Sequence, residues 1–458
     1  MMKLKIFGLI VLIVGLIISL DLGKKVSQLL SEASGKKAEI IVEADKELGK
    51  MPRPWNSYGQ GGEASDGMLQ TAVSQMKSLS PNYIRIDHIY DFYEVVQKEN
   101  GSLRFSFDKL DKEVEAILAS GAKPFLALSY MPPAMASNVT DQPNNWGEWQ
   151  ALVKATIEHY SGKQNKNISN VYYEVWNEPD LFGNWKMYGE KNYLELYRQS
   201  AIAADKAGNV QPFKLGGPAT TGLYKNWTEG LFKFINDGNL RFDFVSWHRY
   251  SLNPDGFVQD VESLSRILSR YPRLALKERV ISEWGPDSKN HPAYDNQIGA
   301  AHAVAAAREM LGIINKAIAF EIKDGLSPEG KAFWGRWGLM THEKTGLQLK
   351  PRYKAFLWLN EIGETRVRLT GEGSFVKGIA AKKGEEIQIN LVNFDPYNAH
   401  QEAVPVIVKN LPPGNYQVVR QDFEGKKSTA EVTITQGTWV GQVLLGPNDI
   451  VRVGLKKI

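Results

Sequence analysis

The chain has 458 residues, which is more than one ordinary domain needs and enough for a large domain with a smaller one. Its 55 basic and 51 acidic residues leave a formal charge of only +4, so no basic surface indicates binding to nucleic acid. The absence of cysteine excludes disulfides, a cysteine nucleophile, thiolate zinc sites and iron–sulfur clusters.

The N-terminus carries an export signal. Lys3 and Lys5 precede an apolar run, Ile6–Leu20, which has no small-x-small cleavage site at its end. We therefore predict an uncleaved signal anchor over residues 1–22 and a tether over residues 23–38, with a cleaved, secreted form as the alternative. The rest of the chain is expected to be held at the inner membrane and to face the periplasm or exterior.

Residues 51–364 alternate between short apolar runs and amphipathic stretches, a pattern typical of βαβ units. Eight such units, the last closed by a helix at Tyr353–Glu361, predict an α/β chain with a (β/α)8 TIM barrel. The eight predicted strands are Trp55–Tyr58, Tyr83–Ile86, Pro124–Leu128, Val171–Trp176, Phe213–Gly216, Phe242–Trp247, Arg279–Ser282 and Ala317–Phe320.

After Thr365 the pattern changes to short β-prone runs separated by Gly, Pro and Asn. This pattern predicts an accessory C-terminal antiparallel β-sandwich over residues 365–458. A β-prone segment at residues 39–50, far away in the sequence, is expected to join this sandwich as a further strand.

Two glutamates follow predicted barrel strands, where catalytic residues of TIM barrels lie. Glu178 follows the fourth strand, and Glu283 follows the seventh. A single glutamate here would usually cap the next helix, but two on opposed strands, each near a tryptophan, favour catalysis. Glycosidic cleavage needs such a pair, because one carboxyl protonates the leaving oxygen and the other meets the developing positive charge.

The motifs around these glutamates carry a resemblance. Trp176–Pro179 and Ser282–Trp284 resemble the four/seven superfamily of retaining glycosidases. The longer stretches Glu174–Leu181, Leu215–Ala219 and Phe244–Tyr250 resemble glycoside hydrolase family 39, and the similarity runs from about residue 39 to the C-terminus. Members of that family include β-xylosidases, α-L-iduronidases and endoglycosidases acting on bacterial exopolysaccharide, and all cleave with retention.

The resemblance implies a role for each matching residue. Glu178 corresponds to the acid/base and Glu283 to the nucleophile, while Asn177 corresponds to the asparagine that binds the sugar 2-hydroxyl. His248 and Tyr250 correspond to the pair that flanks the nucleophile, although His248 could also be an ordinary core histidine. No metal or organic cofactor is required by this mechanism.

One stretch departs from the β-xylosidase pattern, which has a histidine and a glycine after the second strand. Here the chain has Asp87 and His88, which argues against a pocket for one xylose and is closer to the family's membrane-anchored exopolysaccharide endoglycosidases. We therefore expect Asp87 and His88 to contact a polysaccharide substrate in an open groove. The candidate residues for stacking against sugars are Trp146, Trp185, Trp284, Trp334 and Trp337.

Other functions remain open at this point. The nearest alternative is an exo-acting, β-xylosidase-like glycosidase, and a more distant one is a non-catalytic polysaccharide-binding protein. A metal hydrolase is disfavoured, because the seven histidines are scattered and no H-E-x-x-H occurs. Serine hydrolase and nucleotide-binding motifs are also missing from the sequence. We expect a monomer.

Overall fold

The computed structural model describes residues 35–62 and 67–458, and within them the chain forms two compact units. One unit comprises residues 49–366 and 381–384, and the other comprises residues 367–380 and 385–458 together with the N-terminal segment that ends at Leu48. The predicted anchor at residues 1–22 lies outside the described residues, as does most of the tether. Within the described ranges, no helix is both long enough and apolar enough to cross a membrane.

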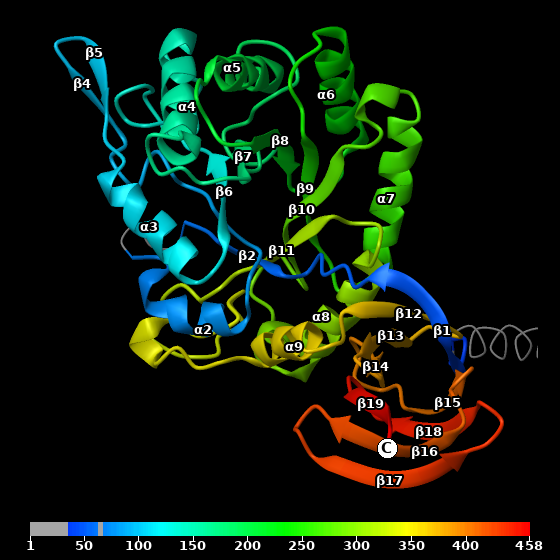
Figure 1. Ribbon diagram of the computed structural model, residues 1–458. Coiled ribbons are helices and arrows are strands. Elements are labelled where there is room, and N and C mark those ends of the chain that lie inside the picture. The colour runs from blue at the N-terminus through cyan, green and yellow to red at the C-terminus, as the bar shows by residue number, and fades with distance from the viewer. Residues whose placement is uncertain (1–34, 63–66) are drawn as a thin grey trace, which may run out of the picture. The chain divides into compact units, whose positions relative to one another are not determined.

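The larger unit contains a closed barrel in which every neighbouring pair of strands is parallel (Figure 1). This arrangement confirms the predicted (β/α)8 fold. In chain order, the barrel strands are β2 (Ser57–Gln60), β3 (Tyr83–Ile86), β6 (Lys123–Leu128), β7 (Val171–Val175), β8 (Phe213–Thr220), β9 (Phe244–Tyr250), β10 (Glu278–Gly285) and β11 (Lys316–Phe320).

Helices alternate with these strands along the chain. Several begin at an asparagine whose side chain accepts a hydrogen bond from the first turn, as Asn145 does from the Gly147 N–H at 2.7 Å. The helices are α2 (Val73–Ser78), α3 (Asp108–Ala119), α4 (Trp146–Ser161), α5 (Tyr193–Lys206), α6 (Lys225–Asp237), α7 (Asp255–Leu268), α8 (Gln297–Met310) and α9 (Pro351–Asn360). The short 3₁₀ helices are η1 (Gln70–Ala72), η2 (Pro272–Leu274), η3 (Pro292–Asp295) and η4 (Glu343–Thr345).

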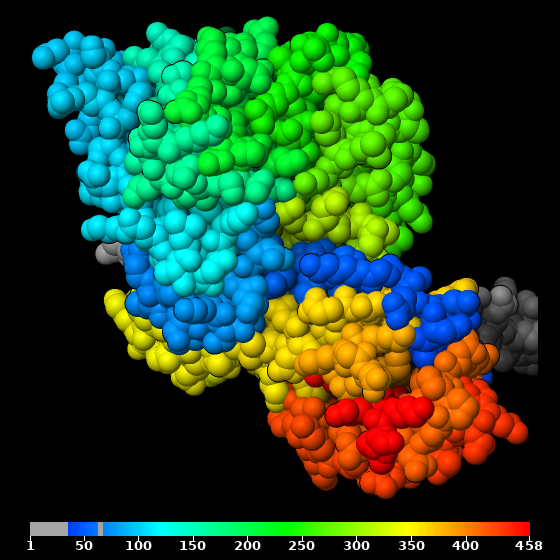
Figure 2. Space-filling model, in the orientation of Figure 1, coloured from blue at the N-terminus to red at the C-terminus, as the bar shows by residue number. Residues whose placement is uncertain are grey.

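A hairpin interrupts this alternation after the second barrel strand. Its strands, β4 (Val96–Glu99) and β5 (Ser102–Phe105), pair only with each other. The hairpin, in light blue, projects from the edge of the barrel unit (Figure 2).

The barrel interior is filled by large apolar side chains rather than open. Phe125, Tyr172, Phe244, Val280 and Ile318 come from different strands and pack as one buried cluster. The rings of Phe125 and Tyr172 stack with their centroids 5.2 Å apart. Since this layer closes the barrel, polar chemistry is confined to the end where the strands terminate.

The smaller unit is built on a nine-stranded sheet in the order β17-β16-β19-β14-β13-β12-β1-β15-β18. Its buried apolar side chains form one core cluster that draws on the strands from β1 to β19, as expected when a sheet folds over itself. The strands are β1 (Ile40–Lys50), β12 (Thr365–Thr370), β13 (Val376–Lys383), β14 (Glu386–Asn393), β15 (Glu402–Lys409), β16 (Gly414–Asp422), β17 (Lys427–Ile434), β18 (Trp439–Leu445) and β19 (Ile450–Lys457).

The N-terminal strand β1 is part of this sheet, as its sequence predicted. It lies between β12 and β15 and pairs in parallel with β15, with Ile40 opposite Val406. The pairs β14–β19, β15–β18, β16–β17 and β16–β19 are antiparallel. These four antiparallel pairs agree with the predicted antiparallel sandwich, and the long connection from β1 through the whole barrel makes the parallel β1–β15 pair possible.

Candidate active site

A cavity of about 930 Å³ lies at the carboxyl ends of the barrel strands. Its walls come from the segments that follow β2, β3, β6, β7, β8, β10 and β11 and from the end of β9. Among the residues that line it are Gly62, Asp87, His88, Tyr130, Asn177, Glu178, Tyr250, Glu283, Trp334 and Trp337. Six of the seven candidate site residues other than the tryptophans therefore line one cavity, and His248 is the exception.

Glu178 is held at the rim by an unusual backbone path after β7. Trp176 and Glu178 adopt positive φ angles of 75° and 46°. Such a conformation costs roughly 1–3 kcal/mol for a non-glycine residue and persists only where the surroundings enforce it. Here the Glu178 N–H donates to the Ala219 carbonyl oxygen of β8 at 2.9 Å, which fixes the carboxyl group above the neighbouring strand.

Glu283 lies near the end of β10, where the strand pairing is irregular. The register with β9 shifts between Ile281 and Glu283, and such a bulge redirects the side chain. One carboxylate oxygen accepts a hydrogen bond from Arg85 Nη1 at 2.8 Å, and the other accepts one from the Tyr250 hydroxyl at 2.7 Å. With 7% of its side chain exposed, Glu283 is fixed in position before any substrate arrives.

Arg85 organises the buried charges below the cavity. Besides Glu283, it donates from Nε to Glu174 at 2.8 Å and from Nη2 to the Asn177 side-chain oxygen at 2.7 Å. The Asn177 amide nitrogen in turn donates to the Tyr130 hydroxyl at 3.0 Å. Burial raises the pKa of Glu283, while the positive charges of His248 and Arg85 oppose this.

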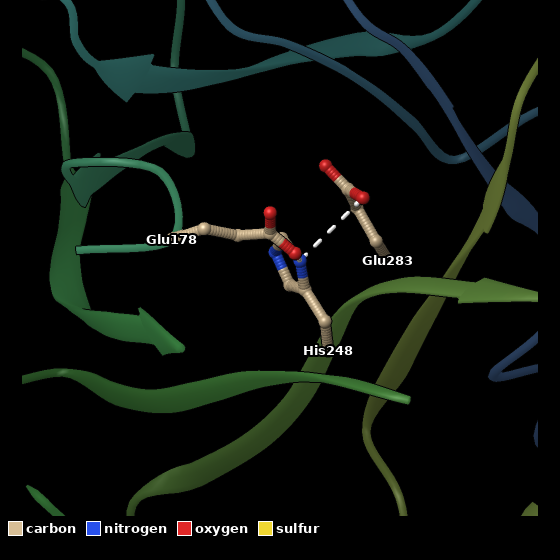
Figure 3. Close-up of side chains that lie close together, drawn as sticks. All are labelled: Glu178, His248 and Glu283. Atoms are coloured by element: carbon tan, nitrogen blue, oxygen red, sulfur yellow. Dashed lines mark hydrogen bonds and ion pairs between the residues drawn. The ribbon is translucent and has the colours of Figure 1, made fainter. Parts of the chain in front are cut away.

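His248 lies beside both glutamates. Its Nδ1 is 2.8 Å from Glu178 Oε1 and 3.5 Å from Glu283 Oε2, and the three side chains point toward one another (Figure 3). Burial lowers the pKa of His248, but the carboxylates of Glu283 and Glu178 outweigh it, so the net shift is upward. His248 is fully buried, yet it bonds to Glu178, which lines the cavity, so it is not merely a core residue.

These three side chains also form the one group among the described residues that could hold a metal ion, since one ligand atom from each lies within 4.8 Å of the others. The charges around these three side chains favour binding of protons over binding of a metal ion. Arg85 already occupies one oxygen of Glu283 and brings a positive charge. A metal would also need a neutral imidazole, whereas the pKa of His248 is raised.

Asp87 and His88 both line the cavity. Asp87 Oδ1 is buried and makes no hydrogen bond to the described residues, so it can accept one from a substrate hydroxyl. The Nδ1 of His88 donates to Asp91 Oδ2 at 2.8 Å, and the His88 ring stacks on Phe92 and lies tilted against Tyr130. Burial lowers the pKa of His88, but Asp87 and Asp91 outweigh it and raise the pKa.

A glycine makes room for His88. A Cβ atom built on Gly62 would lie 2.3 Å from the His88 ring, so any larger residue would displace the imidazole. The Gly59–Gly62 stretch therefore serves close packing beside the cavity.

The five candidate tryptophans divide into two groups. Trp334 and Trp337 line the cavity, and the Arg336 guanidinium lies 3.4 Å from the centroid of the Trp337 ring. The other three do not line it, so their predicted stacking role is corrected. These three are Trp146, Trp185 and Trp284.

Local packing explains why these three tryptophans do not line the cavity. Trp284 follows Glu283 on the same strand, and successive side chains point to opposite faces, so Trp284 packs outward against Phe257 and Phe356. Trp185 is buried against Trp176, with ring centroids 5.1 Å apart. Trp146 is the first residue of α4, outside the cavity.

Sequence reasoning missed three charged residues of the site. Arg85 and Glu174 stand inside otherwise apolar strand segments, and a charge in such a run was the available signal. Glu321 directly follows β11 and accepts a hydrogen bond from Gln60 Nε2 at 2.9 Å. Burial raises the pKa of Glu321 well above its ordinary value.

A closed barrel of parallel strands that presents two adjacent carboxyl groups at its C-terminal rim is the arrangement of a glycoside hydrolase. Residues 38–392 match the family model described as Glycosyl hydrolases family 39, and the chain belongs to this family.

Relatives agree with this assignment. The chain is 26% identical over 412 residues to a β-xylosidase of Caldicellulosiruptor saccharolyticus, an alignment covering 81% of this chain and 82% of that protein. It is 24% identical over 191 residues to an α-L-iduronidase of Homo sapiens, covering 38% and 28%. The crystal structure of a monomeric β-xylosidase from Caulobacter crescentus CB15 has the same fold, with a TM-score of 0.76 and 21% identity over 92% of this chain and 100% of that one.

Proposed function

We propose that this glycoside hydrolase cleaves with retention by double displacement, with Glu178 as acid/base and Glu283 as nucleophile. The observation that carries the proposal is the spacing of the two side chains, whose nearest ligand atoms lie within 4.8 Å. Retaining enzymes hold their carboxyl groups about 5–5.5 Å apart, whereas inverting enzymes leave roughly 6.5–9.5 Å for a water molecule.

In the first step, Glu178 donates a proton to the leaving oxygen while a Glu283 oxygen attacks C1. The glycosidic C1–O bond breaks and an ester between the sugar and Glu283 forms. The hydrogen bonds from Arg85 and Tyr250 stabilise the Glu283 carboxylate before attack. The Nδ1 of His248 is placed to stabilise Glu178 after it has lost its proton.

In the second step, Glu178 removes a proton from water, and the water oxygen attacks C1 from the face that the leaving group vacated. The ester bond breaks and the anomeric configuration is restored. Asn177 is held by Arg85 and Tyr130 on either side, a fixed orientation suited to bonding the sugar 2-hydroxyl in both transition states.

We further infer endo action on an exopolysaccharide. A cavity of about 930 Å³ is large for one sugar, and it extends from Glu178 and Leu181 to Trp334 and Trp337. Asp87 and His88 replace the histidine and glycine expected in a β-xylosidase. The alternative is exo action on xylosides, which the similarity to β-xylosidases over 81% of the chain favours.

Location is part of the proposal. Residues 1–22 combine flanking lysines with an apolar run, which supports an anchor that keeps the enzyme at the inner membrane, near exported polysaccharide. Membrane fractionation of the full chain would test this. A fully soluble protein with a trimmed N-terminus would contradict the anchor and leave secretion.

The test of the catalytic proposal is product analysis on a panel of exopolysaccharides and aryl glycosides, xylosides included. Wild type, Glu178→Gln and Glu283→Gln are compared, with Glu190→Gln as the control, because Glu190 is exposed and does not line the cavity. Oligosaccharides from wild type and control alone support the endoglycosidase. Single sugars support the exo alternative, and equal activity of all four proteins would refute the catalytic pair.

A further inference from the structure

The cavity wall beside Glu178 differs in chemistry from the rest of the cavity. Four side chains make up this apolar wall, namely Val139, Leu181, Phe182 and Tyr224. Their exposed fractions are 39%, 57%, 41% and 44%, so apolar surface faces solvent at the cavity mouth. Leu181 and Phe182 lie after β7, and the other two lie on the loops after β6 and β8.

The polar groups nearby are already engaged with each other. The Thr221 hydroxyl donates to Asp180, and the Tyr224 hydroxyl lies 2.9 Å from the same Thr221 oxygen. By contrast, the deeper part of the cavity presents Asp87, Asn177 and the catalytic carboxyl groups. The apolar wall therefore offers contact area but few hydrogen bonds to a bound sugar.

The apolar wall lies next to Glu178 and can therefore contact the leaving sugar. This step rests on the proposed function, in which Glu178 is the acid. The acid must touch the oxygen of the leaving group, so the leaving sugar lies next to Glu178. The backbone N–H groups of Leu181 and Phe182 donate to the Glu178 carbonyl oxygen at 3.0 and 2.8 Å. These bonds hold the backbone of both residues within one turn of Glu178, and both residues line the cavity beside it.

We propose that the apolar wall binds a leaving sugar that carries a methyl or acetyl group, as 6-deoxy and O-acetylated sugars do. A hydroxyl pressed against leucine and valine loses its bonds to water without replacement. A methyl group in the same place gains from burial, by roughly fourfold in binding for each methyl covered.

Transfer of the bound sugar to added acceptors measures which acceptor sugars this subsite prefers. An acceptor hydroxyl takes the place of water: its oxygen bonds to C1, its proton passes to Glu178, and the ester bond to Glu283 breaks. Because hydrolysis and transfer start from the same glycosyl-enzyme, the ratio of transfer product to hydrolysis product depends only on how well the acceptor binds and reacts.

The experiment uses whichever aryl glycoside the product panel shows to be cleaved as the sugar donor. The acceptors are methyl glucoside, its 6-deoxy analogue and its 6-O-acetyl ester, with the same three compounds in the manno series. We expect at least one modified acceptor to give a transfer ratio several-fold above its parent sugar. The better of the two modifications identifies the methyl or the acetyl group as the natural substituent.

Two variants connect the preference to the wall. Leu181→Asn replaces an exposed apolar side chain and is expected to reduce the preference to about that of the parent sugar. Tyr188→Ser, on the same loop but outside the cavity, is expected to retain it. Transfer without any preference in wild type, or a preference unchanged in Leu181→Asn, would overturn the subsite while leaving the retaining mechanism intact. An absence of transfer to every acceptor would also overturn the subsite, whereas an inverted hydrolysis product would count against the double displacement itself.

Discussion

Replacing Arg85 by methionine separates the electrostatic support of the nucleophile from the rest of the site. Arg85 has no exposed side-chain surface and bonds to two buried carboxylates, Glu174 and Glu283, each at 2.8 Å. An arginine next to a carboxylate lowers the carboxyl pKa by roughly one to three pH units. Its removal should therefore raise the pKa of Glu283 by about that amount, above a value that burial has already raised.

The sign of the effect on activity follows from the mechanism. Glu283 must be ionised to attack C1, so kcat/KM falls as the pH drops through its pKa. A higher pKa in Arg85→Met moves this acid limb to higher pH by roughly one to three units. The variant also leaves two buried carboxylates unpaired, which is expected to lower the free energy of unfolding by about 3–5 kcal/mol.

The assay is the pH profile of kcat/KM on an aryl glycoside, with urea unfolding measured in parallel. Arg104→Gln is the matched control, since Arg104 forms an exposed ion pair with Glu99 and should shift nothing. Arg85→Lys keeps the positive charge without the guanidinium fork, so the acid limb of its pH profile should lie between those of wild type and Arg85→Met. If Arg85→Met does not fold, Arg85→Lys carries the test, and a profile identical to wild type would refute the role of Arg85.

Three further predictions concern other parts of the barrel unit. Tyr250→Phe removes the hydroxyl that bonds Glu283 and should lower kcat roughly 10- to 100-fold in steady-state kinetics, whereas an unchanged kcat would contradict its role. Lys350→Met leaves the buried Asp324 without its ion-pair partner and should lower the free energy of unfolding, measured in urea, by about 3–5 kcal/mol. A loss below about 1 kcal/mol, as for an exposed ion pair, would contradict a stabilising role for this pair. Trp337→Ala should raise KM for oligosaccharides roughly five- to tenfold with little change in kcat, and an unchanged KM would remove this ring from the binding surface.

The sequence predicted the barrel well because its strands are apolar runs bounded by polar residues. The second strand was predicted at Tyr83–Ile86 and is found there. The first was predicted at Trp55–Tyr58 but runs from Ser57 to Gln60. Its last residue is polar because Gln60 bonds to Glu321, a partner 261 positions away that hydrophobic patterning cannot reveal.

The same limit applies to the site. Glu178 and Glu283 stood out because each follows a strand in a distinctive motif. Arg85 did not, since its partners lie 89 and 198 positions further along the chain and its charge is paired only after the barrel closes. Trp284 was misplaced because its neighbour Glu283 faces the cavity, and the alternation of a strand sends the next side chain the other way.

Covalent labelling tests the central claim most directly. A 2-deoxy-2-fluoro derivative of the cleaved aryl glycoside slows the hydrolysis of the glycosyl-enzyme, so the intermediate accumulates. Peptide mass spectrometry then locates the attached sugar. Double displacement as described here predicts one sugar per chain, on Glu283. A sugar on another carboxylate, or no adduct together with an inverted product, would contradict it.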